Sequence, residues 1–281
     1  MAYTQLKPRH SQGAHVEEIS GESSHYLLAI PAGKGDKYRL AQLDDYAQLA
    51  RRYFPRRSPV RLSLLARTSS NSIPGTWGFG VWNDPFGLSL GFGGNQFRLP
   101  ALPNAAWFFC ASEENYLSFK ETRHPSTPTR SAQDGSVAAN GFLVQTFRSP
   151  RFDLQLIPAG LALPFSQRKT RQLLGKVIEE DGIRLWTPAA SRRIPEPVPG
   201  RQRVDPTQWH RYQLCWHERR VNFTVDDVVV FESPVSPRGP LGLVIWIDNQ
   251  YAAFTPEGKI RFGVLENPEP AWLEVKEIEI L

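Results

Sequence analysis

Three carboxylates stand at the ends of segments that have the residue pattern of β-strands: Asp84, Glu113 and Asp248. A carboxyl group in an apolar setting can act as a general acid, while a second carboxylate acts as base or nucleophile. Because catalytic groups often come from the ends of separate strands, these residues are the candidates for an acid/base pair. The alternative is structural, since an Asn-Asp-Pro run such as residues 83–85 also ends a strand by capping a turn.

A second set of residues could hold a ligand by ring stacking and hydrogen bonding. An indole ring matches the apolar face of a pyranose, and polar side chains beside apolar strands are costly to bury without partners. The candidate ligand-binding residues are Trp82, Asn83, Trp107, Tyr116, Gln145, Arg148, Trp246, Asn249 and Tyr251. For each tryptophan the competing interpretation is an ordinary core side chain, and for residues 113–116 it is a solvated turn.

The sequence gives no pattern of metal ligands. No spacing of His, Cys and carboxylate residues is typical of zinc, so we expect no metal site and no cofactor. Turns rich in carboxylates do not exclude a structural calcium ion. Cys110 and Cys215 are the only cysteines, and their apolar surroundings favour two buried thiols over a disulfide.

Strands must position these candidates, because apolar residues alternate along most of the chain. For example, Tyr212, Leu214 and Trp216 alternate with more polar neighbours, and the alternation resumes at Val221 after a turn. The 24 Pro and 21 Gly are spread between such segments, as short strands joined by turns require. The pattern predicts an all-β fold, a two-sheet antiparallel jelly-roll sandwich, with residues 209–225 as a hairpin.

The domain organisation follows from where this alternation stops. Residues 1–24 are polar and unpatterned, which predicts a flexible lead-in, and residues 25–281 are expected to form a single jelly-roll domain. Helical spacing predicts a short helix at 41–53 and a second helix at 167–180, inside an insertion at about 153–204. The second helix is expected to pack on the sandwich; the alternatives are a lid or a membrane-surface helix.

The net charge of +5 is unevenly placed. Basic residues gather between 165 and 204, and a second cluster comprises Arg51, Arg52, Arg56, Arg57 and Arg61. The longer segment lacks interleaved aromatics and nucleic-acid-binding motifs, so we expect solvated loops and no nucleic-acid partner. No apolar stretch is long enough to span a bilayer. The first residues lack the apolar run of a secretory signal, which favours a cytoplasmic protein unless the sequence begins after a leader.

A resemblance to a known family lies in the C-terminal part. Two successive strand-like segments carry Trp209, His210, Tyr212, Leu214 and Trp216, then Val221, Phe223, Val225 and Asp226. They resemble the W-H-x-Y-x-L-x-W and V-x-F-x-V-D-G strands of the concanavalin A-like lectin/glucanase superfamily, and of family 16 glycoside hydrolases in particular. Residues 74–84 are similar to the tryptophan strand lining the cleft of those enzymes. The resemblance implies a jelly roll with a concave inner sheet, and covers roughly residues 59–119, 141–148 and 208–281.

The sequence departs from that family where catalysis would occur. Family 16 hydrolases carry a Glu-x-Asp-x-(x)-Glu run, because retaining hydrolysis needs two carboxyl groups about 5–5.5 Å apart. The corresponding segment here, residues 103–115, has no carboxylates two or four positions apart within its strand. We therefore expect no retaining hydrolysis of the ordinary family 16 type. By resemblance, the residues expected on the concave face are Trp82, Trp107, Gln145, Trp246, Asp248 and Asn249.

Two functional interpretations of different classes follow. The first is a degenerate relative of the glycan hydrolases that binds a saccharide or another small amphipathic ligand in an aromatic-lined cleft. The second is an enzyme, a glycoside hydrolase or lyase, whose acid/base pair comes from separate strands. Docking of the 167–180 helix on anionic lipid is favoured less, and the oligomeric state stays open.

Overall fold

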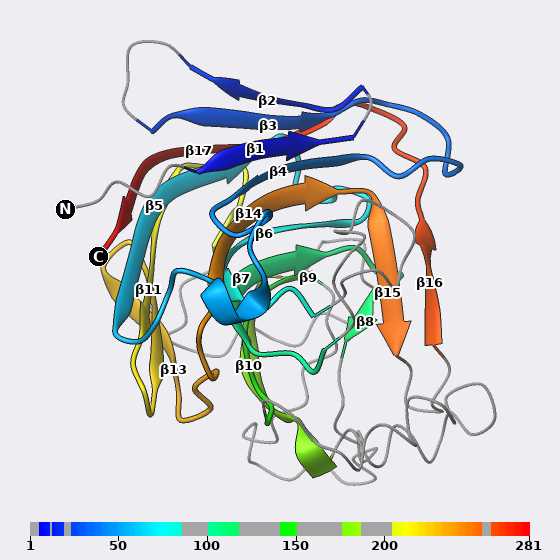
Figure 1. Cartoon of the computed structure of the whole chain (residues 1–281). Helices are drawn as coiled ribbons and strands as arrows, with labels where there is room; N and C mark the ends of the chain where they lie inside the picture. The colour runs from blue at the N-terminus through cyan, green and yellow to red at the C-terminus, as the bar shows by residue number, and fades with distance from the viewer. Residues whose placement is uncertain are drawn as a thin grey trace, which may run out of the picture.

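The computed structural model describes residues 6–11, 13–19, 24–85, 101–117, 141–150, 176–186, 204–254 and 260–281. Two seven-stranded sheets pack face to face, and a three-stranded sheet lies beside them (Figure 1). Every strand pair within the two large sheets is antiparallel. The predicted two-sheet antiparallel sandwich is confirmed, and it is the architecture that the resemblance implied.

The first large sheet, called the inner sheet, carries the candidate residues. Its order is β1 (Lys7–His10), β4 (Leu40–Asp44), β14 (Gly242–Asp248), β6 (Thr76–Trp82), β7 (Ala105–Ala111), β9 (Gly141–Arg148) and β10 (Glu179–Trp186). In Figure 1, β14 and the facing β5 bend together, with the inner sheet on the inside of the bend. The side of the inner sheet that faces away from the sandwich is therefore concave.

The second large sheet, called the outer sheet, covers the other side of the core. Its order is β13 (Val228–Ser233), β12 (Val221–Val225), β11 (His210–Trp216), β5 (Val60–Thr68), β17 (Ala271–Ile280), β3 (Tyr26–Ile30) and β2 (His15–Glu18). The predicted hairpin is present as β11 and β12, with Trp216 opposite Val221. The small sheet comprises β16 (Ile260–Val264), β15 (Gln250–Phe254) and β8 (Tyr116–Leu117).

The core lies between the two large sheets and follows the period-2 pattern of their strands. Trp77, Phe79 and Val81 of β6 point into it, and Tyr212 and Leu214 of β11 meet them from the outer sheet. All five side chains are at most 2% exposed. Because alternate residues point to opposite faces, the remaining side chains of the inner strands lie on the concave face.

The helix predicted at 41–53 is wrong. Residues 40–44 form β4, and only Arg51–Tyr53 forms a helix, a short 3-10 turn labelled η1. The Asp44 carboxylate accepts hydrogen bonds from the backbone N–H groups of Tyr46 and Ala47, which turns the chain at the end of β4. Pairing of β4 with both β1 and β14 therefore outweighs the helical spacing.

The flexible lead-in is also wrong for the residues that the structure describes there. Residues 7–10 form β1 at one edge of the inner sheet, and residues 15–18 form β2 at one edge of the outer sheet. The helix predicted at 167–180 lies mostly outside the described residues; Lys176 and Val177 are helical, but Glu179 already belongs to β10. Within the described ranges, no helix has the length and apolar character needed to cross a membrane.

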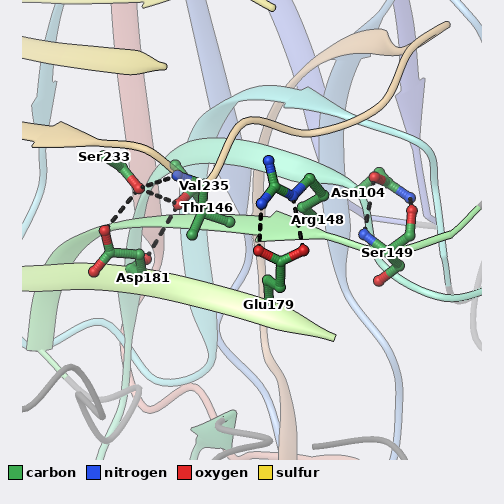
Figure 2. A network of polar contacts seen from close by, with 8 residues as sticks. All are labelled: Asn104, Thr146, Arg148, Ser149, Glu179, Asp181, Ser233 and Val235. Carbon is green, nitrogen blue, oxygen red and sulfur yellow. Dashed lines mark hydrogen bonds and ion pairs between the residues drawn. The ribbon is translucent and has the colours of Figure 1, made fainter. Parts of the chain in front are cut away.

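The far edges of the two sheets are joined by a polar network between β9, β10 and the end of β13 (Figure 2). Ser233 donates to the Asp181 carboxylate (Oγ to Oδ2, 2.7 Å), and its hydroxyl lies 3.0 Å from that of Thr146. Ser233 Oγ also accepts the backbone N–H of Val235. Ser233 and Thr146 are fully buried, so this network fastens the inner sheet to the outer sheet away from solvent.

Candidate functional site

The concave face of the inner sheet carries a second apolar cluster, distinct from the sandwich core. Its aromatic centre, called the aromatic face, comprises Trp82, Trp107, Phe109, Phe147 and Trp246. These residues come from β6, β7, β9 and β14, and their strand neighbours point into the sandwich. The side chains of Trp82, Trp107 and Trp246 therefore point to the concave side of their strands, as predicted.

The three indoles pack against one another. The rings of Trp82 and Trp246 are almost parallel, with an interplanar angle of 4° and centroids 6.1 Å apart. Trp107 lies 5.9 Å from each of them, tilted by 57° and 58°. Offset and tilted arrangements of this kind are favourable for aromatic rings.

Two glycines of β6 make room for this packing. A Cβ atom on Gly78 would lie 2.8 Å from the Trp246 ring and 2.4 Å from the carbonyl oxygen of Phe108. A Cβ atom on Gly80 would lie 2.7 Å from the Cβ of Trp107. The close neighbours of these glycines are thus the backbone and the tryptophans of the adjacent strands.

The indoles differ in accessibility and in the use of their N–H groups. Trp107 and Trp246 are 2% and 6% exposed, whereas Trp82 is only partly buried. The Trp246 N–H donates to the Thr76 hydroxyl (2.9 Å). The Trp107 N–H is buried and has no hydrogen-bond partner in the described part of the chain. Trp82 therefore offers accessible ring surface, and Trp107 offers an unused donor.

Asp248 lies at one end of this face in a buried hydrogen-bond network. Its carboxylate accepts from the Thr76 hydroxyl (2.7 Å), the Tyr38 hydroxyl (3.1 Å) and the backbone N–H of Gln250 (3.3 Å). Burial raises the pKa of Asp248 to about 6, although these hydrogen bonds oppose the rise. Asp248 therefore changes charge near neutral pH. The sequence did not indicate Tyr38 or Thr76, because they approach from separate segments.

Gln145 lies on the same face, and Arg148 lies at the end of its strand. Gln145 is 3% exposed and stands directly opposite Trp107 in the β7–β9 pairing. Arg148 makes a two-pronged ion pair with Glu179 of β10 (Figure 2). Gln145 thus extends the face with a polar group, while Arg148 links two strands.

The side chains of Asn83 and Asn249 form hydrogen bonds with backbone groups. The Asn83 amide donates to the carbonyl of Leu102 and accepts from the N–H of Asn104. Asn249 is fully buried, with its amide donating to the Lys37 and Leu265 carbonyls and its oxygen accepting the Arg39 N–H. The prediction that Asn249 lines the concave face is therefore wrong.

Tyr116 and Tyr251 lie on the small sheet. Tyr116 is in β8, which pairs in parallel with β15, and Tyr251 is in β15 and partly buried. The ring of Tyr251 packs over Gly263 of β16, where a Cβ atom would lie 2.8 Å away. Among the side chains that the structure describes, Tyr251 does not belong to the aromatic cluster of the inner sheet.

The three candidate catalytic carboxylates are not brought together. Asp248 pairs with Thr76 at one end of β6, while Asp84 lies beyond Trp82 at the other end, about 20 Å away at roughly 3.3 Å per residue. Glu113 lies near the Asp248 end, but it is exposed in the turn after β7. An acid/base pair that includes Asp84 and either of the others is excluded by this separation. Within the described ranges, no group of three or more His, Cys, Asp or Glu could hold a metal ion.

Comparison with known proteins gives similarity in fold alone. No family model and no curated protein matches the sequence. The structure is similar to a glycoside hydrolase family 16 endo-glucanase from Bacteroides ovatus, with 8% identity, a TM-score of 0.44, and coverage of 100% of this chain and 96% of that chain. A putative beta-glucanase from Mycobacterium abscessus gives 11% identity and a TM-score of 0.41, covering 100% and 94% of the two chains.

The binding domain of botulinum neurotoxin DC is also similar, with 5% identity and a TM-score of 0.41. The match covers 99% of this chain but 43% of that chain, and a sialidase is covered over only 17% of its length. At such identities and TM-scores the likeness supports no further step. The fold rests on the sheets described above.

Proposed function

We propose that the chain binds a saccharide at the aromatic face, with Trp82 stacking on a sugar ring. The observation that carries the proposal is the Trp107 N–H, which is buried beside Trp82 and has no acceptor among the described residues. Leaving such a donor unpaired costs about 1–3 kcal/mol. Where the side chains that cover this N–H shift on binding, a sugar hydroxyl or ring oxygen would accept its hydrogen bond and remove that cost.

The surroundings favour a sugar over a purely apolar ligand. The partly buried Trp82 offers an apolar ring surface, while Gln145 and Asp248 supply polar groups on the same side of the sheet. This combination of an aromatic platform with a few placed polar groups is typical of sites for small polar ligands. Binding is favoured over hydrolysis because the positions of β7 on this face are Ala105, Trp107, Phe109 and Ala111.

Calorimetric titration with cellotetraose and with a mixed-linkage tetrasaccharide from lichenan tests the proposal. We expect one or both to bind, Trp82→Ala to weaken binding about tenfold through lost stacking, and Trp107→Phe to weaken it about fivefold through the lost donor. Trp272→Phe is the matched control, because Trp272 is partly buried on the opposite side of the sandwich, beside Arg67.

The control must retain the affinity of the unmodified protein, and thermal unfolding must show that all variants are folded. Absence of binding to both tetrasaccharides at millimolar concentration would contradict the proposal. Equal weakening by Trp107→Phe and Trp272→Phe would also contradict it.

A further inference from the structure

We infer that the saccharide is anionic, and that a carboxylate or sulfate on it contacts Arg52 and Arg57 of the loop attached to the end of β6. The inference rests on the proposed function and names the class of ligand. The two arginines belong to residues 47–59, called here the basic loop, which includes η1 (drawn in blue in Figure 1).

The basic loop is fixed at the Trp82 end of the aromatic face. The Arg51 guanidinium donates to the carbonyls of Asn83 (2.8 Å) and Asp84 (2.5 Å), the two residues that follow Trp82. Tyr46, which directly precedes the loop, meets Trp82 edge to face with ring centroids 6.2 Å apart, and Phe54 of the loop packs on Tyr46 at 4.8 Å. The loop therefore borders the indole that offers accessible ring surface.

The arginines of this loop divide into two kinds. Arg51 holds the carbonyls just named, and Arg56 pairs with the buried Asp45 carboxylate at 2.7 Å. Arg52 and Arg57 are exposed, and neither has an ion-pair partner in the described part of the chain. No acidic residue occurs anywhere between Tyr46 and Asn83 in the sequence. The border of the aromatic face thus carries positive charge that its own segment does not neutralise, and such a surface attracts anions.

Exposed side chains of the basic loop place an aromatic ring and apolar surface next to these charges. Tyr53 is 61% exposed, and the Arg52 guanidinium lies over its ring at 4.7 Å from the centroid. Leu49 is 37% exposed on the same loop. An aromatic ring beside a cation suits a sugar that carries both an apolar ring face and an acid group. The loop is attached to the end of β6, directly after Trp82. A loop that binds an anionic bilayer would not need this attachment, so the attachment favours an anionic sugar as the ligand.

The test compares two tetrasaccharides that differ only at C6. Cellotetraose carries a hydroxymethyl group there, and β-1,4-linked tetraglucuronate carries a carboxylate. We expect the glucuronate to bind about tenfold more tightly at low salt and to lose most of this advantage at high salt. Arg52→Gln and Arg57→Gln should each reduce the preference about threefold. Arg219→Gln, an exposed arginine in the turn after β11, is the control and should leave the preference unchanged.

Each outcome separates this inference from the proposed function. Equal binding of both tetrasaccharides overturns the inference and leaves saccharide binding in place. Binding of neither overturns the proposed function and the inference with it. Absence of a glucuronate preference, together with Arg52-dependent binding to vesicles of phosphatidylserine and phosphatidylcholine, overturns the inference and assigns the loop to a membrane surface.

Discussion

Asp248 shows how burial and hydrogen bonding compete at a single residue. Three donors approach its carboxylate, from Thr76, Tyr38 and the backbone of Gln250, and each favours the charged form. The side chain is nevertheless only 6% exposed, and the loss of water outweighs the three donors, so its pKa rises to about 6. A charge can therefore be present or absent at the end of the aromatic face near neutral pH.

This shift predicts how stability depends on pH. The folded-state pKa lies above the ordinary value of 3.8, so the native protein binds the Asp248 proton more tightly than the unfolded chain does. The stabilisation that comes from this tighter proton binding is fully present below about pH 4. It falls by about 1.4 kcal/mol per pH unit as the pH rises to about 6. Asp248→Asn removes the ionisation, so we expect the variant to gain about 2–3 kcal/mol relative to the unmodified protein between pH 4 and pH 7.

Urea unfolding at pH 4, 5, 6 and 7 measures this difference. Glu113→Gln is the control, since it removes a carboxylate that is exposed in the turn after β7. A stability difference for Asp248→Asn that does not change with pH would contradict the raised pKa of this carboxyl.

The residue types of the site were predictable from the sequence, but their roles were not all predictable. Alternation places Trp82, Trp107 and Trp246 on one face because each strand has a fixed period of two residues. The same argument fails for Asn249, whose position after the end of β14 lies outside the regular strand, and its amide binds three backbone groups instead. Tyr38 reaches Asp248 across 210 residues of sequence, and no local pattern reports such a contact.

At the scale of elements, strand β6 contributes side chains to both the sandwich core and the concave face. Its odd-numbered residues enter the sandwich core, and its even-numbered positions, Gly78, Gly80 and Trp82, form part of the concave face. The two glycines leave space into which the side chains of β14 and β7 extend. The small residues of one strand thus determine where the large residues of its neighbours can lie.

Gly78→Ala is expected to destabilise the protein by about 1–3 kcal/mol. The added methyl would lie 2.4 Å from the Phe108 carbonyl oxygen and 2.8 Å from the Trp246 ring, so the strands or the ring must shift. Near-UV circular dichroism should change with the Trp246 environment, and urea unfolding measures the loss of stability. Trp246→Leu in the Gly78→Ala background should recover part of the loss, because the ring contact is removed. If Gly78→Ala changes neither the stability nor the spectrum, Gly78 does not lie in close contact with the Trp246 ring and the Phe108 carbonyl.

Two physical reasons explain why the sequence did not predict some of the strands. Strands β1 and β2 have only four residues each and are mostly exposed, so they lack the apolar alternation that marks a buried strand. Strand β4 is buried on both faces, with Ala41 and Leu43 in the core and Leu40 in the second cluster. Its apolar residues can therefore satisfy a helical spacing as easily as a strand spacing, and the neighbouring strands decide between them.

For the whole molecule, the important feature is that each sheet edge meets an edge of the other sheet. At one side, β1 continues the inner sheet and β2 the outer sheet, with only residues 11–14 between them. At the other side, Asp181 of β10 and Ser233 of β13 hydrogen-bond across the gap. The two sheets therefore approach each other at both sides of the sandwich, although in the described part of the chain no backbone ladder joins β1 to β2 or β10 to β13.

The contact between the far edges should be energetically coupled. Ser233 is fully buried, donates to Asp181 and accepts the N–H of Val235, so Ser233→Ala leaves buried groups without partners and should cost about 1–3 kcal/mol. A double-mutant cycle of Ser233→Ala with Asp181→Ala, followed by urea unfolding, should give a coupling of at least about 1 kcal/mol. Arg148 of β9 and Glu179 of β10 form the control pair, which joins two strands of the inner sheet; both are partly exposed, and their cycle should give a smaller value. If the exposed pair couples more strongly than the buried one, the two sheets are not held together at this edge by Ser233 and Asp181.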